Sequence, residues 1–244
     1  MTPGRPVGMR CLYPGPGQVD PEDAYAVQVD GPWLRANMVS TVDGAVTAAD
    51  GRSAGVSGPA DKRVFGLLRR LADVVLVGAG TARAEGYRPA RLPIALVTAR
   101  LDLDLESPLL AAAEHRTIVL TAASAGAQRL AAAARVADVV VCGDDHVDLS
   151  VAVLELHARG LRHVLCEGGP RLLGSVTAAG LLDELCLTLS PLLVGGMDSG
   201  DGGKPGSTAR ILAGPPLPSA CRLELAHLLE EDGALFARYL VVGT

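Results

Sequence analysis

Short, continuously apolar runs recur along the middle of this chain, and they are the feature that most limits its fold. Five of them stand out, at residues 73–78, 94–98, 117–121, 139–142 and 163–166. An apolar run of this length without polar alternation is typical of a strand that is covered on both faces. Strands of this kind belong to largely parallel sheets, so the pattern predicts an α/β fold.

Helical segments are expected before and between these strands. Asp148 and Gly160 flank the segment 149–159 as start and stop signals. Apolar residues also recur at helical spacing after the Ser57-Gly58-Pro59 cap, and two further helices are expected at 125–134 and 170–179. The alternation predicts a mixed, mostly parallel sheet with helices on both faces.

The two ends of the chain depart from this pattern. Residues 33–42 form a β-leaning run that ends at Asp43-Gly44, and residues 184–194 form another before a glycine-rich loop at 195–206. Runs at 222–229 and 234–242 around Asp232-Gly233 predict a C-terminal antiparallel hairpin. We expect one domain over 20–244, preceded by an irregular arm over 1–19, which is broken by Pro3, Pro6, Pro14 and Pro16.

Composition excludes several functional classes. Lys plus Arg number 22 against 27 Asp plus Glu, and only 3% of residues are aromatic, so nucleic acid is not an expected partner. No signal peptide or long apolar run is evident, and the five cysteines form no Cys-x-x-Cys pair, so we expect a cytoplasmic protein without membrane spans. The histidines show no metal-ligand spacing, and no G-x-S-x-G pentapeptide occurs.

Two strand-to-helix junctions are rich in glycine. One runs from Glu167 through Gly168 and Gly169 to Pro170, and the other contains Gly78-Ala-Gly80. Glycines let a phosphate approach the backbone, and the N–H groups of a first helical turn attract its charge. Together the two junctions are able to hold the two ends of a dinucleotide, although the Rossmann fingerprint is absent. Each junction alone has a plain turn as its alternative interpretation.

Other polar residues lie where strands end or share one face. Thr98 and Arg100 follow a strand and are candidates for a ribose 2′-phosphate, with a solvated strand end as the alternative. Asn37 and Thr41 share one face of their strand and are candidates to face a heterocycle, or else a satisfied polar pair. Glu85 and Glu167 are candidates for proton handling, with a solvated glutamate as the alternative.

Four segments in order resemble the reductase domain of bacterial riboflavin biosynthesis, the RibD C-terminal domain family, whose fold is similar to dihydrofolate reductase. They are MVSTVDG at 38–44, LLRRLADVVLVGAGT at 67–81, EGGP at 167–170 and GLLDELCLTLSPLLVGG at 180–196. The zinc motif of that family's deaminase half is absent from the sequence. The resemblance implies a stand-alone, NADPH-dependent reductase of a phosphoribosylamino-pyrimidine that pairs as a homodimer and needs no metal.

The resemblance also implies site residues. Those expected to hold NADPH are Ser40, Gly55, Gly80, Thr81, Glu85, Thr98, Arg100, Gly168, Gly169, Pro170, Arg171, Leu172, Leu173, Gly174 and Ser175. Those expected to bind substrate are Asn37, Thr41, Ser53, Arg69, Arg88, Arg91 and Glu167. Glu85 and Glu167 are expected to be catalytic.

Two departures from the family pattern leave the substrate open. Asn37 stands where the family usually has lysine, and residues 85–91 replace its usual Asp-Asn-Pro-x-Leu-Thr-x-Arg segment. A dihydrofolate- or pterin-directed paralogue therefore remains an alternative, as does a nucleotide-binding module without catalysis. A purely structural interaction protein fits least well, because it leaves the two glycine turns and Glu167 at strand ends without a purpose.

Overall fold

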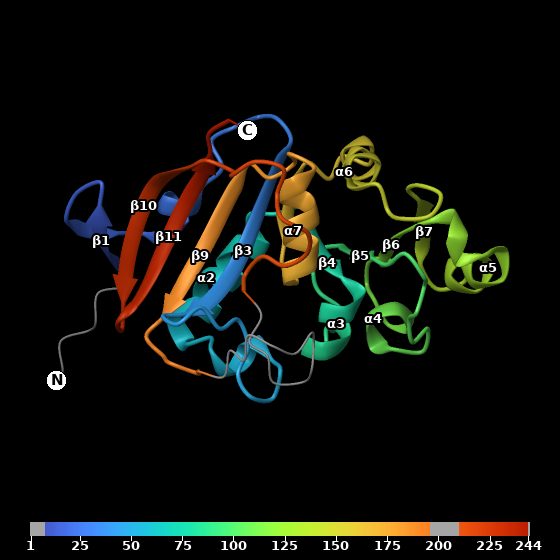
Figure 1. Ribbon diagram of the computed structural model, residues 1–244, viewed down its shortest axis with the longest axis horizontal. Coiled ribbons are helices and arrows are strands. Elements are labelled where there is room, and N and C mark those ends of the chain that lie inside the picture. The colour runs from blue at the N-terminus through green and yellow to red at the C-terminus, as the bar shows by residue number, and fades with distance from the viewer. Residues whose placement is uncertain (1–7, 196–209, 244) are drawn as a thin grey trace.

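The computed structural model describes residues 8–195 and 210–243, and within them one sheet of eleven strands forms the centre of the molecule (Figure 1). The strand order is β2-β1-β10-β11-β9-β3-β8-β4-β5-β6-β7. The strands are β1 (Met9–Tyr13), β2 (Gly17–Val19), β3 (Trp33–Thr41), β4 (Val74–Gly78), β5 (Ile94–Val97), β6 (Ile118–Thr121), β7 (Asp138–Val141), β8 (His163–Cys166), β9 (Glu184–Ser190), β10 (Leu223–Glu231) and β11 (Ala234–Val241).

The predicted strand pattern is confirmed. In the described part of the chain, the strands from β7 to β9 in the sheet order are all parallel. Beyond β9, the strands β11, β10, β1 and β2 pair antiparallel. The predicted hairpin turn lies between β10 and β11, where Asp232 and Gly233 both have positive φ angles, as a tight hairpin turn requires.

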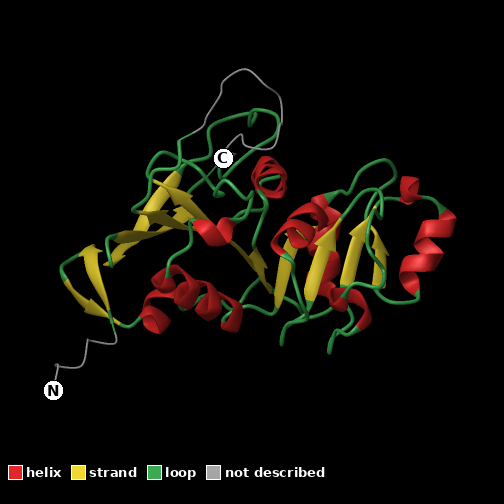
Figure 2. Ribbon diagram, turned by 90° about the horizontal axis from the view of Figure 1, so that it is seen from below, coloured by secondary structure: helices red, strands yellow, loops and turns green. Residues whose placement is uncertain are grey.

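Helices cover both faces of this sheet, as the sequence predicts (Figure 2). They are α1 (Pro21–Tyr25), α2 (Pro59–Arg70), α3 (Ala79–Glu85), α4 (Pro108–Ala111), α5 (Ala127–Ala134), α6 (Leu149–Ala158) and α7 (Pro170–Ala178). Short 3₁₀ turns, η1 (Ser53–Gly55) and η2 (Ala123–Ala125), precede α2 and α5. Proline opens α2 and α7 at their first turn, and Asp148 caps α6.

Alternate residues of the central strands belong to two separate hydrophobic clusters, one on each face of the sheet. Val75 and Val77 of β4 pack with α2, α3, α4 and α5, whereas Val74 and Leu76 pack with α6 and α7. Successive side chains of a strand point to opposite faces, so a continuously apolar strand fills both clusters. This is the physical reason that the five apolar runs predicted the fold class.

Three local predictions need correction. Residues 9–13 and 17–19, expected to be irregular, form β1 and the edge strand β2, because the distant strand β10 pairs with β1 and β1 in turn pairs with β2. The helix expected from 125 begins only at Ala127, because Gly126 has φ +87° and interrupts it. The strand expected over 184–194 ends at Ser190, before Pro191. Apart from Gly195, the predicted glycine-rich loop lies outside the described residues.

None of the helices that the structure describes is long and apolar enough to cross a membrane. The carboxyl ends of the parallel strands meet at one edge of the sheet, as they must in any parallel sheet. Gly78 ends β4 beside Val97 of β5, and Leu76 pairs with Cys166 of β8. The two glycine-rich junctions and Thr98 therefore come together from distant parts of the sequence.

Candidate active site

The two glycine junctions contact each other directly at this edge of the sheet. Gly78 N–H donates to the carbonyl of Gly168 at 2.8 Å, and Gly169 N–H donates to Thr81 Oγ1 at 2.8 Å. A Cβ atom at position 169 would lie 2.5 Å from Thr81 Oγ1, and Gly168 has φ +81°. Both positions therefore require glycine, the first for close approach and the second for its backbone conformation.

The first turn of α7 starts immediately after these glycines. Pro170 occupies its first position, and no side chain caps its N–H groups. Leu172 and Leu173 are buried in the hydrophobic cluster of α6 and α7, and a Cβ at Gly174 would lie 2.3 Å from the carbonyl oxygen of Ala213. These three residues hold the helix in place, so only the backbone of the first turn is available to an anion.

Ser175 and Arg171 lie on the exposed side of the same helix. The Ser175 hydroxyl donates to the carbonyl of Arg171 at 3.1 Å, so it serves the helix itself. The Arg171 side chain is exposed beside the uncapped first turn. Of the two, Arg171 is the one that adds positive charge near the glycine turn.

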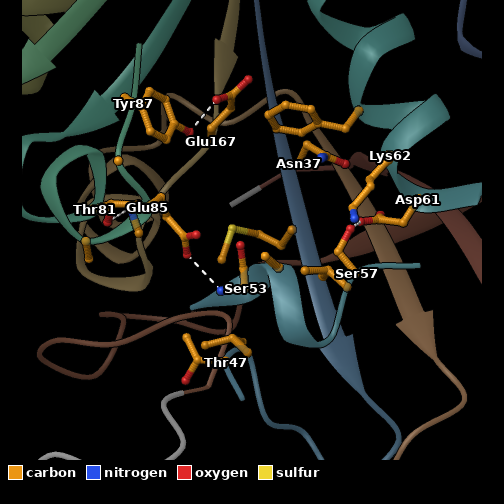
Figure 3. A pocket seen from close by; sticks show the side chains of 18 of the residues that line it. Asn37, Thr47, Ser53, Ser57, Asp61, Lys62, Thr81, Glu85, Tyr87 and Glu167 are labelled. Carbon is orange, nitrogen blue, oxygen red and sulfur yellow. Dashed lines mark hydrogen bonds between the residues drawn. The ribbon is translucent and has the colours of Figure 1, made fainter. Parts of the chain in front are cut away.

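A cleft of about 550 Å³ opens beside the glycine turn and runs toward α2. Figure 3 shows Thr81, Glu85 and Tyr87 on one side of it and Ser57, Asp61 and Lys62 on the other. Nine of the residues expected from the sequence line it: Asn37, Ser53, Arg69, Thr81, Glu85, Arg88, Glu167, Gly169 and Pro170. The structure thus brings together most of the expected substrate residues with part of the expected cofactor residues.

Several expected residues lie outside this cleft. Thr41 is fully buried, where its hydroxyl bonds to Asp43 and accepts the N–H of Ala45 at 2.9 Å. The Ser40 hydroxyl donates to the carbonyl of Thr41. The β3 turn occupies both hydroxyls, so the structure does not bring Thr41 to the heterocycle side with Asn37.

Gly55, Gly80 and Arg91 do not line the cleft either. A Cβ at Gly55 would lie 2.4 Å from the Cβ of Ala48, so this glycine allows η1 to pack closely. Gly80 faces open space, and Arg91 is exposed. Thr98 and Arg100 follow β5 at the same sheet edge, where Arg100 is exposed and Arg129 donates to its carbonyl at 3.0 Å.

Glu167 is the most constrained polar residue of the cleft. Its side chain is 2% exposed and accepts two hydrogen bonds from Arg69, each 2.7 Å long. Tyr87 donates a third bond, to Oε2. The Arg69 guanidinium also lies over the rings of Phe65 and Tyr87, at 4.5 and 5.4 Å from their centroids. Arg69 is therefore held as a planar, oriented cation at the cleft wall.

The protonation states of this cluster follow from burial and charge. Burial disfavours the charged form of Arg69, but its hydrogen bonds to Glu167 and that carboxylate's charge outweigh it and raise the pKa of Arg69. Burial and then the Glu167 charge raise the pKa of Tyr87 well above its ordinary value. Tyr87 therefore stays protonated and remains a donor to Glu167.

Glu85 has a different environment. One of its oxygens accepts the backbone N–H of Ser53 at 2.8 Å, which joins α3 to the 3₁₀ turn η1 across the cleft mouth (Figure 3). Its side chain is half-buried, and no ion pair to it is found among the described residues. Of the two carboxylates expected to handle protons, Glu85 keeps an oxygen available to a ligand, whereas Glu167 has both oxygens occupied.

Sequence reasoning missed several lining residues, among them Phe65, Tyr87, Ser57, Asp61 and Lys62. A signal for one of them was present. Asp61 stands three residues before Val64, on the side of α2 that carries the apolar stripe, so a buried carboxylate was to be expected there even though acids are common in a first helical turn. Tyr87 had no comparable signal, because it follows the left-handed Gly86 that ends α3 and only the fold directs it to Glu167.

Within residues 8–195 and 210–243, no group of three or more His, Cys, Asp or Glu side chains is placed to hold a metal ion. A dinucleotide fits better. The uncapped turn of α7, the glycines that bring two backbones together and the nearby Arg171 match a diphosphate in shape and charge.

Comparison with known proteins identifies the family. The family model of the RibD C-terminal domain matches residues 32–226, which run from the start of β3 into the first part of β10 and include every residue of the cleft. The chain belongs to the RibD C-terminal domain family.

Similar family members include two archaeal proteins, each named a 2,5-diamino-6-ribosylamino-4(3H)-pyrimidinone 5′-phosphate reductase. The one from Methanothermobacter thermautotrophicus is 31% identical over 87% of this chain and 99% of its own length. The one from Archaeoglobus fulgidus is 26% identical over 85% of this chain and 98% of its own length. A solved pyrimidine reductase-like protein from Corynebacterium diphtheriae has a TM-score of 0.79, with 26% identity over 93% of this chain and all of that one.

Proposed function

We propose that this chain is an NADPH-dependent oxidoreductase that reduces a phosphoribosylamino-pyrimidine of riboflavin biosynthesis. One observation carries the proposal: in a member of the RibD C-terminal domain family, a cleft joins the Gly168-Gly169 turn to the oriented Arg69–Glu167 pair. The names of the archaeal relatives support the same reaction class.

The cofactor is assigned to the sheet edge. Thr81, Gly168, Gly169 and the backbone N–H groups at the start of α7 would hold the diphosphate of NADPH. Arg100 and Thr98, which follow β5 at that edge, would hold the 2′-phosphate that distinguishes NADPH from NADH. When bound, the nicotinamide supplies a hydride to the ribose carbon attached to the pyrimidine's amino nitrogen.

The chain's own residues orient the substrate and manage its charge. Arg88 lines the cleft, is exposed and has no carboxylate partner within the described residues, which suits a substrate phosphate. Arg69 presents a fixed cation, and Glu167 positions it without moving a proton, because all its oxygens are engaged. Of the two carboxylates expected to handle protons, Glu85 is the one left to exchange a proton with the nitrogen beside the reduced carbon.

NADPH consumption by the purified protein tests this function. We expect the absorbance of NADPH to fall on addition of a phosphoribosylamino-pyrimidine, and to stay constant with dihydrofolate under the same conditions. Oxidation with dihydrofolate alone would instead indicate a pterin-directed paralogue. Binding of NADPH without oxidation by either compound would leave a nucleotide-binding module, and the proposed function would be wrong.

A further inference from the structure

Asp61 is a buried carboxylate that has no cationic partner in the described part of the chain. The residue is 6% exposed, on the first turn of α2, and it lines the cleft. Its Oδ2 accepts a short hydrogen bond from the Ser57 hydroxyl, while its Oδ1 is buried and has no hydrogen-bond partner. A buried acceptor of this kind is costly unless something donates to it.

A second acceptor without a partner stands in the same part of the cleft. The Oδ1 atom of Asn37, on β3, is also buried and unbonded within the described residues. Figure 3 shows Asn37 and Asp61 together on the side opposite Thr81 and Glu85. Glu167, by contrast, has all its acceptor oxygens satisfied by protein groups. On one side of the cleft, protein donors therefore satisfy the carboxylate of Glu167, whereas on the other side acceptor atoms of Asn37 and Asp61 have no donor.

The missing donors match one edge of one kind of pyrimidine. A 2,5-diamino-4(3H)-pyrimidinone presents an amino group at C2 beside the N–H of N3, which makes two adjacent donors. The corresponding uracil presents a carbonyl oxygen at C2, which a carboxylate repels. Two acceptors in the wall therefore favour the first ring and disfavour the second.

We infer that Asp61, together with Asn37, selects a pyrimidine that carries an amino group at C2 over one that carries a carbonyl there. The inference rests on the proposed function and adds to it which ring enters the cleft and which residues recognise it. In reaction order, it places the reduction before any step that removes the amino group at C2. Lys62, which is exposed in the same wall, is assigned no part in this choice.

The unmodified protein provides the first test. NADPH oxidation is measured with 2,5-diamino-6-ribosylamino-4(3H)-pyrimidinone 5′-phosphate and with 5-amino-6-(5-phosphoribosylamino)uracil. We expect kcat/KM to be about tenfold or more higher for the diamino compound. The loss of a hydrogen bond to a charged group costs at least the free energy that corresponds to a tenfold change. Equal turnover of the two, or preference for the uracil, would overturn the inference and leave the proposed function intact. No turnover of either would instead remove the proposed function.

Asp61→Asn tests the residue itself. The asparagine keeps the shape but offers an N–H group to a C2 carbonyl, so we expect kcat/KM to fall for the diamino compound and to rise for the uracil. The ratio of the two values should change about tenfold or more. A damaged fold lowers both values alike, and so does loss of a contact to the ribose. A parallel fall for both compounds would therefore contradict the inference.

Two control variants are measured alongside Asp61→Asn. Lys62→Met removes the neighbouring charge from the same wall and should leave the ratio between the two compounds unchanged. Asp23→Asn removes an exposed acid from the first turn of α1 and should change neither value. If Asp61→Asn does not fold, calorimetric binding of both compounds to the unmodified protein replaces it. Tighter binding of the uracil would then refute the selection.

Discussion

Two buried glutamates, Glu184 and Glu167, make almost the same contacts but lie in different parts of the molecule. Glu184 on β9 is fully buried, and it pairs with Arg35 at 2.6 Å and with Arg238 at 2.9 Å. The indole N–H of Trp33 donates to it as well, at 3.0 Å. Glu167 has the analogous set of one arginine and one aromatic donor.

The difference lies in what surrounds each network. The two arginines around Glu184 also donate to backbone carbonyls of Tyr25 and Ala24, so that network ties α1 to the sheet. In the part of the chain that the structure describes, Trp33 and Arg35 of this network border a space of only about 10 Å³, whereas Glu167 lines a cleft of about 550 Å³. Burial and ion pairing alone therefore do not distinguish a structural carboxylate from one that serves a ligand. The open volume beside the pair does.

The largest expected effect belongs to the structural network. Glu184→Gln leaves Arg35 and Arg238 buried without a carboxylate, so we expect the free energy of unfolding to fall by about 3–5 kcal/mol. Urea titration measures this loss. Kinetic constants per folded molecule should not change, because the network does not reach the cleft. A large kinetic loss with an unchanged unfolding midpoint would reverse the roles assigned to the two glutamates.

The same network has a predicted acid limit. Burial by itself would raise the pKa of Glu184, but Arg35 and Arg238 outweigh it and hold the pKa below its ordinary value of 4.5. A carboxylate whose pKa is lower in the folded state stabilises the fold above its unfolded pKa. That stabilisation is lost as the pH falls through the folded value, and the Glu184→Gln variant should not show this loss.

His227 makes the network sensitive to milder acid. Its ring packs edge-on against Tyr25 at 4.8 Å, and burial, followed by the charge of Arg238, lowers its pKa from 6.5 to about 4. The folded state therefore favours neutral histidine, and stability is lost as the pH falls from 6.5 toward 4. The loss amounts to about 3 kcal/mol when the pH has fallen through the folded pKa, at 1.36 kcal/mol for each unit of pKa difference.

His227→Phe should keep the packing on Tyr25 and remove this loss. Thermal unfolding of both proteins across the range from pH 7 to about pH 4 should show a flatter curve for the variant. The variant should lose no stability at pH 7, because His227 Nε2 has no hydrogen-bond partner in the described structure. Parallel curves for the two proteins would show that other groups cause the acid sensitivity.

The sequence predicts most strands, helices and turns of this fold, but not all of them. Continuous apolar strands, the Asp148 cap of α6 and the Asp232-Gly233 turn are local signals, and the structure confirms each of them. Strands β1 and β2 could not be predicted in this way, because β1 pairs with β10, more than two hundred residues later, and β2 joins the sheet through β1. Prolines nearby also argue against strands unless the strand lies at an edge.

The site residues divide in the same way, into those whose place follows from local sequence signals and those whose place depends on the whole fold. Glu167, Gly169 and Thr81 follow strands, so sequence alone placed them at one edge of the sheet, and they do meet there. Tyr87 and Ser57 reach the cleft through the path of loops, which no periodicity specifies. The resemblance to the family implied a cofactor role for Leu172 and Leu173, and the helix turns both side chains into the core, which leaves their backbone for such a role.

The last of these comparisons concerns Glu167, whose replacement should change the kinetic constants more than the stability. Glu167→Gln removes the charge that orients Arg69, whose side chain is 24% exposed and so partly compensated by water. We expect kcat/KM for the pyrimidine to fall between about tenfold and a hundredfold, which corresponds to about 1.4–2.8 kcal/mol. The unfolding midpoint should move less than in Glu184→Gln.

The pH profile of turnover decides what Glu167 does. If it only positions Arg69, the profile of Glu167→Gln keeps every ionisation of the unmodified enzyme, because no proton moves through the carboxylate. Tyr87→Phe is the matched control, since it deletes one hydrogen bond to Glu167 and leaves the Arg69 pair in place. It should cost only a fewfold in kcat/KM. An ionisation missing from the Glu167→Gln profile would make Glu167 a proton carrier, and the contrast with Glu184 would then be one of chemistry as well as of open volume.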